Sequence, residues 1–147
     1  MSKHSQLAKE LFDKGYNCAQ SVVLAFCDET GLDSKTALKL SSSFGGGMGR
    51  LREVCGAVSG MFMVAGMLYG YFDPLDRQAK VEHYKLIQYL GMKFKEENNS
   101  IICRELTSIP AEKEGNIKRR TCSELVEQAG EILDEYIQSR KEPTNLN

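Results

Sequence analysis

The chain has 147 residues, and its 19 Lys and Arg residues nearly balance 20 Asp and Glu residues, which leaves a formal net charge of −1. This length predicts a single domain that buries a core without disulfide staples. The balanced charge gives no reason to expect a nucleic acid or an anionic membrane surface as a partner.

The first third of the chain shows helical periodicity. Gly15 is expected to end the first helix, Asn17 to cap the second, and Asp33 or Ser34 to cap the third. A glycine-rich break is predicted at residues 45–49. The three predicted helices span about residues 6–14, 18–29 and 34–44.

The rest of the chain is predicted to be helical as well. Thr121 and Glu124 match a capping box at the start of the last helix. A loop is predicted over residues 108–120 and a disordered tail from about residue 141. The predicted helices span about residues 54–71, 74–98 and 121 onward, with a short helical turn near 101–106.

These elements predict an all-α fold because no segment has a convincing strand pattern. We expect one domain over residues 1–147, a compact bundle of about five or six helices around the glycine-rich apolar helix at 54–71. Residues 54–72 carry no charge, but they lack long runs of Leu, Ile and Val. A helix packed on several sides is therefore expected rather than a membrane span. A homodimer is one way to cover small residues that remain exposed on it.

Five cysteines are spread over the chain without any Cys-x-x-Cys pair. With no apolar signal segment at residues 1–6 and an odd cysteine count, we expect a reducing, cytoplasmic location. Thiols there are more often metal ligands or reactive groups than structural bridges. The five are Cys18, Cys27, Cys55, Cys103 and Cys122.

Three cysteines are expected at the starts of helices, namely Cys18, Cys55 and Cys122, and Cys103 is expected in or beside a helical turn. The N–H groups at a helix start favour the thiolate form, so a shared site is one interpretation. Ordinary burial of free thiols in the core is the other. Cys27 lies on the opposite face of a regular helix from Cys18 and is interpreted as a small buried hydrophobic residue.

The glycine-rich loop and the two histidines have less specific interpretations. Residues 45–50 are able to cradle an anion, but the loop lacks the Gly-Lys-Ser/Thr ending of a P-loop. We prefer the interpretation that these glycines let the backbone pass close to a site or to another helix. His4 is expected in a frayed start and His83 on a helix surface, and neither is expected to bind metal.

The ordered set of motifs resembles a family that is named for redox activity and labelled C-GCAxxG-C-C. The resemblance runs from Gly15 to Cys122. Here the central motif reads Cys-Gly-Ala where the label has Gly-Cys-Ala. The motifs that carry it are Gly15-Tyr16-Asn17-Cys18-Ala19-Gln20, Gly45-Gly46-Gly47-Met48-Gly49, Cys55-Gly56-Ala57-Val58-Ser59-Gly60 and the single Cys103 and Cys122.

The resemblance implies that Cys18, Cys55, Cys103 and Cys122 are the characteristic cysteines and that Cys27 is not. The chain also looks like the non-haem part of split-Soret cytochromes, which implies an iron–sulfur cluster. Without Cys-x-x-Cys-His, covalent haem is not expected.

Three functions follow as hypotheses. The first is electron transfer by a metal or iron–sulfur site on the four cysteines, with Gly46, Gly47 and Gly56 bringing backbone N–H groups near the sulfurs and with an unidentified redox partner. The second is a thiol–disulfide oxidoreductase in which two of the four cysteines react as thiols. The third is a non-enzymatic helical module with structural zinc. Whether the protein is an enzyme stays open at this point.

Overall fold

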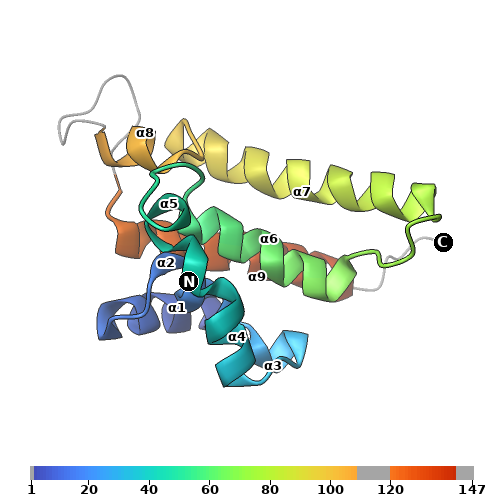
Figure 1. Ribbon diagram of the computed structural model, residues 1–147, viewed down its shortest axis with the longest axis horizontal. Coiled ribbons are helices and arrows are strands. Elements are labelled where there is room, and N and C mark those ends of the chain that lie inside the picture. The colour runs from blue at the N-terminus through green and yellow to red at the C-terminus, as the bar shows by residue number, and fades with distance from the viewer. Residues whose placement is uncertain (1, 109–119, 142–147) are drawn as a thin grey trace.

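The computed structural model describes residues 2–108 and 120–141, and the predicted all-α fold is confirmed there (Figure 1). Six α-helices in this part have eight or more residues: α1 (Lys3–Lys14), α2 (Cys18–Ala25), α4 (Ser34–Ser41), α6 (Gly56–Tyr69), α7 (Arg77–Asn98) and α9 (Cys122–Lys141). The shorter pieces are α3 (Cys27–Thr30), the 3-10 turn η1 (Ser42–Phe44), α5 (Gly45–Met48) and α8 (Cys103–Ser108). Most of the predicted loop, residues 109–119, and the predicted tail, residues 142–147, lie outside the described residues.

The predicted helix caps are confirmed. Asn17 and Gln20 form a reciprocal capping box at the start of α2, and the Asp33 side chain accepts a backbone hydrogen bond at the start of α4. Thr121 and Glu124 form the second capping box, with distances of 2.8 and 3.2 Å. Such contacts satisfy N–H groups that a helix leaves unpaired at its start.

The single helix predicted over residues 18–29 is wrong, because the chain breaks at Phe26. There φ is −104° and ψ is 15°, and this residue separates α2 from α3. The Phe26 side chain is fully buried and stacks on the His4 ring with centroids 4.3 Å apart. Tertiary packing of Phe26 thus overrides the local helix preference that the hydrophobic periodicity indicates.

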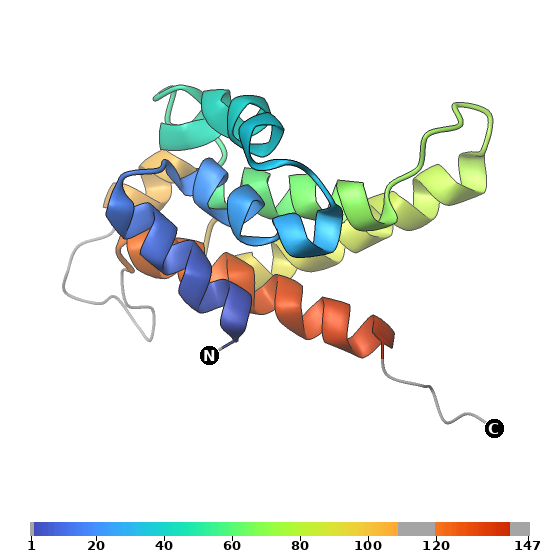
Figure 2. The same cartoon turned by 90° about the horizontal axis from the view of Figure 1, so that it is seen from below.

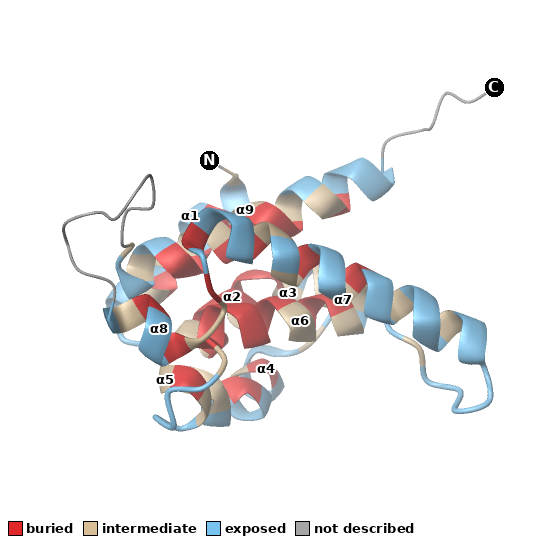
Figure 3. Ribbon diagram, turned by 90° about the horizontal axis from the view of Figure 1, so that it is seen from above, coloured by how far each residue is buried: buried red, intermediate tan, exposed pale blue. Residues whose placement is uncertain are grey.

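Helices α2 and α6 pack together, and α6 also contacts α7 and α9. Figure 2 shows α1 alongside α9, and Figure 3 shows the buried residues gathered on α2, α6 and the inner faces of α1 and α9. A Cβ at Gly60 would lie 2.9 Å from the Ala19 carbonyl oxygen, so glycine allows α6 to approach α2 closely. Within residues 2–108 and 120–141, no helix combines the length and apolarity needed to cross a membrane.

The glycine-rich break is a tight turn and not an extended loop. Gly46 and Gly47 have φ values of 68° and 70° inside α5, and Met48, Arg50 and Arg52 also have positive φ. Left-handed backbone is tolerated best by glycine. This turn delivers residues 52–55 to the start of α6, beside the segment that precedes α8.

Candidate functional site

The four family-type cysteines all lie at helix starts. Cys18, Cys103 and Cys122 are the first residues of α2, α8 and α9, and Cys55 is the residue just before α6. Cys27 also begins a short helix, α3. Position at a helix start therefore does not separate the four from the fifth.

A shared cavity distinguishes the four family-type cysteines from Cys27. Cys18, Cys55, Cys103 and Cys122 all line one cavity of about 190 Å³, and Cys27 does not. The Cys27 sulfur instead approaches the Val23 carbonyl oxygen at 3.7 Å. The other lining residues are Phe12, Asn17, Gly46, Arg52, Gly56, Leu106, Thr107 and Leu125. The structure thus groups the four cysteines as the sequence interpretation placed them; their role as ligands stays a prediction.

The four cysteines differ in exposure and are not tightly clustered. Cys55 and Cys103 are buried, Cys18 is half-buried and Cys122 is exposed. Within the described residues, no three of the cysteine sulfurs lie within 4.8 Å of one another. The cavity therefore spreads its thiols around a space instead of bringing them to a single point.

Two strand-like segments bring Cys55 and Cys103 together. Val54 and Ile102 form an isolated antiparallel β-bridge. The Cys55 N–H donates to the Ile101 carbonyl at 2.8 Å, and the Cys103 N–H donates to the Glu53 carbonyl at 2.6 Å. The sequence analysis found no convincing strand pattern in any segment, and no local signal could have revealed a pairing across nearly fifty residues.

The predicted glycines surround the cysteines closely. A Cβ at Gly56 would collide with the Cys18 sulfur, and a Cβ at Gly47 would lie 2.6 Å from the Cys103 Cβ. Gly46 and Gly56 line the cavity, whereas Gly47 packs behind Cys103. Glycine at these positions leaves room for the thiol groups that any other residue would displace.

Arg52 is a polar neighbour that sequence reasoning did not single out as part of the cysteine site. Its Nη1 lies 3.8 Å from the Cys103 sulfur, and its backbone is left-handed with φ 63°. Positive φ is uncommon outside glycine and is not visible from composition. Arg52 thus supplies the guanidinium group that faces a cysteine in this cavity.

The expectation of a favoured thiolate is wrong for Cys55. Burial raises its pKa to about 12, and the neighbouring Cys18 and Cys103 add to this effect. Hydrogen bonds from the backbone N–H groups of Ala57 and Val58 lower it, but by less. Loss of hydration raises the Cys55 pKa by more than the N–H groups at the helix start lower it, so an unliganded Cys55 is a neutral thiol.

His4 is buried instead of frayed. Its Nδ1 lies 2.7 Å from an Asp134 oxygen, and its Nε2 lies 2.8 Å from an Asp28 oxygen. The ligand atoms of His4, Asp28 and Glu29 lie within 4.8 Å of one another. Because both ring nitrogens already bond carboxylates and Lys141 pairs with Glu29 at 3.2 Å, this cluster is a network of polar contacts that ties α1 to α3 and α9.

Fold and site together define a class: a small all-α protein with four cysteines, from four separate helix starts, around one cavity. The family model described as "Putative redox-active protein (C_GCAxxG_C_C)" matches residues 16–136, and the chain belongs to this family. The resemblance seen in the sequence is thereby confirmed. No curated protein and no solved structure matches the chain.

Proposed function

We propose that Cys18, Cys55, Cys103 and Cys122 hold an iron–sulfur cluster and that the protein transfers electrons. The carrying observation is that four cysteines distant in sequence line the same cavity while the fifth does not. When bound, such a cluster supplies one-electron exchange. The redox character given by the family description supports the proposal.

Structural zinc on the same four cysteines is the alternative, because tetrahedral zinc also accepts four thiolates. A cluster contains iron and inorganic sulfide and zinc does not, so metal and sulfide analysis separates the two.

The burial of Cys55 bears on the thiol–disulfide alternative. A neutral thiol with a pKa near 12 is a poor nucleophile, which weakens the thiol–disulfide hypothesis for this cysteine. Binding to a cationic iron centre is a way to hold its sulfur as a thiolate inside the protein. The N–H groups of Ala57 and Val58 then stabilise negative charge on that sulfur.

The other lining residues have separate tasks. Phe12, Leu106 and Leu125 supply apolar wall that limits contact with water. Arg52 directs a positive donor at the Cys103 sulfur. A hydrogen bond and a positive charge near a sulfur favour the reduced, more negative cluster, so Arg52 would raise the reduction potential. Exclusion of water favours the oxidised, less negative cluster, so the apolar wall would lower the reduction potential.

Anaerobic purification with iron and acid-labile sulfide analysis tests the proposal. Visible absorption with stoichiometric iron and sulfide is the expected result. Serine replacement of Cys18, Cys55, Cys103 or Cys122 should each strongly reduce the iron content, whereas the matched control Cys27→Ser should retain it. Colourless protein with stoichiometric zinc, or equal behaviour of all five variants, would refute the cluster.

A further inference from the structure

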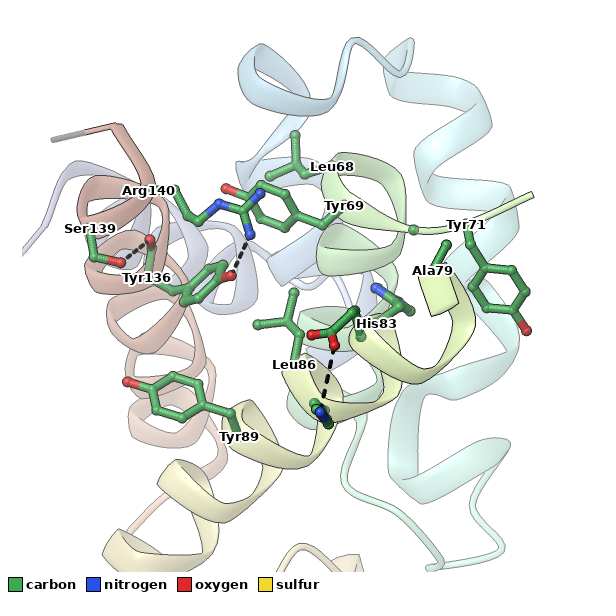
Figure 4. A pocket seen from close by; sticks show the side chains of 13 residues that line it. Leu68, Tyr69, Tyr71, Ala79, His83, Leu86, Tyr89, Tyr136, Ser139 and Arg140 are labelled. Atoms are coloured by element: carbon green, nitrogen blue, oxygen red, sulfur yellow. Dashed lines mark hydrogen bonds and ion pairs between the residues drawn. The ribbon is translucent and has the colours of Figure 1, made fainter. Parts of the chain in front are cut away.

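A second cavity of about 690 Å³ lies between the C-terminal ends of α6 and α9 and the first half of α7 (Figure 4). Its lining includes Tyr69, Tyr71, Tyr89 and Tyr136, which are four of the six tyrosines in the chain. None of its lining residues lines the cysteine cavity. Its volume is within the range typical of small-molecule sites.

Aromatic rings form one wall of this cavity. The rings of Tyr69 and Tyr136 meet edge to face with centroids 5.4 Å apart, and Tyr89 lies 6.0 Å from Tyr136. Leu68 and Leu86 complete the apolar part of the lining. Tyr69 and Tyr136 are half-buried and Tyr89 is exposed, and their rings provide flat apolar surface that favours offset stacking or edge-to-face packing with another ring.

Arg140 adds a positive charge to the same wall. Its guanidinium carbon lies 4.5 Å from the Tyr69 ring centroid, and its Nη1 donates to the Tyr136 hydroxyl at 2.7 Å (Figure 4). Within the part of the chain that the structure describes, Arg140 has no carboxylate partner, whereas Lys85 pairs with Glu82 at 3.5 Å. Among the described residues, the aromatic rings thus hold the Arg140 guanidinium group at a cavity whose one lining carboxylate, Glu82, pairs with Lys85.

The His83 side chain also lines this cavity. Its Nδ1 is buried and has no hydrogen-bond partner among the described residues. Buried polar atoms are normally paired, and those that are not point to a missing partner.

We propose that this cavity binds a planar aromatic molecule that carries a carboxylate. The ligand's ring packs against the tyrosines, and its carboxylate accepts two parallel hydrogen bonds from Arg140. The proposal does not depend on the cysteines, and it assigns the cavity a ligand whether or not the protein holds a cluster.

Isothermal titration of the whole chain with 2-naphthoate tests this binding, with neutral 2-naphthalenemethanol as the matched probe. One molecule of naphthoate should bind saturably with a dissociation constant below about 1 mM. The alcohol should bind at least about tenfold more weakly, because it lacks the charge-assisted hydrogen bonds. This comparison uses the unaltered protein, so folding of a variant does not affect it.

Arg140→Gln and Lys141→Gln are the paired variants. Each removes one positive charge from the end of α9, but Lys141 faces Glu29 and not this cavity. Arg140→Gln should weaken naphthoate binding at least about tenfold, and Lys141→Gln should leave it within about twofold. No saturable binding, equal binding of the alcohol, or equal binding by Arg140→Gln would overturn the proposal.

Discussion

Replacement of Gly56 by alanine should drive a methyl group into the cysteine cavity. The added Cβ would collide with the Cys18 sulfur and lie 2.9 Å from the Phe44 carbonyl oxygen and 3.2 Å from the Ala19 nitrogen. Favourable contacts for carbon are near 3.5–4.0 Å, so the Phe44 carbonyl must move by roughly 0.5–1 Å. The Phe44 oxygen, at the turn before α5, and the Ala19 nitrogen, in α2, are both backbone atoms, and backbone does not move as freely as a surface side chain.

The expected loss of unfolding free energy follows from two opposing effects. Overpacking of a filled site costs about 1–3 kcal/mol, and alanine recovers up to about 1 kcal/mol through its greater helix preference. We therefore expect Gly56→Ala to lower the unfolding free energy by about 1–2 kcal/mol. Displacement of the Cys18 sulfur should also reduce the iron content of anaerobically purified protein.

Gly66 provides the matched control because it lies on the same helix and a Cβ there meets nothing within 4 Å. Gly66→Ala should raise the unfolding free energy by up to about 1 kcal/mol and leave the iron content unchanged. Urea unfolding measures the first quantity, and iron and sulfide analysis measures the second. If Gly56→Ala were as stable as Gly66→Ala and kept its full iron content, the close packing around Cys18 would be refuted.

Three further outcomes are expected. Arg52→Gln should lower the reduction potential of the proposed cluster, because it removes a positive donor 3.8 Å from the Cys103 sulfur. The control Arg50→Gln, in the same turn, should change the potential less. Potentiometric titration measures both shifts, and equal shifts would contradict this role of Arg52. Burial acts to raise the pKa of Asp28, but the hydrogen bond and charge of His4, together with the Lys3 charge and the Glu29 backbone N–H, outweigh it, so the pKa is lowered overall. Asp28 therefore stabilises the fold above about pH 4, and this contribution is lost as the pH falls further; urea midpoints between pH 7 and 3 should fall less steeply in Asp28→Asn, and an identical slope would refute it. Leu133→Ala should lower the unfolding free energy by about 2–5 kcal/mol because Leu133 is fully buried on α9, and a loss below about 1 kcal/mol would contradict its place in the core.

The helices and their caps were predictable because the interactions that determine them are local. Asn17 caps α2 as predicted and pairs reciprocally with Gln20 three residues further on, and Thr121 and Glu124 form the predicted capping box. The family could also be assigned from ordered motifs, and the match over residues 16–136 confirms it. The spacing of the cysteines alone left ordinary core burial open.

Contacts between distant segments decided the rest. The pairing of residues 52–55 with 101–104 joins Cys55 to Cys103, and the buried stack of Phe26 on His4 interrupts a helix that local periodicity favours. The same holds for the pKa of Cys55, because the sequence reveals the N–H groups of a helix start but not the loss of water around the sulfur. Sequence by itself determined that the chain is all-α, where the main helix caps lie, and which cysteines belong to the family pattern. Only the tertiary structure determined which groups share a cavity and how strongly burial acts on them, because both depend on packing between residues far apart in the chain.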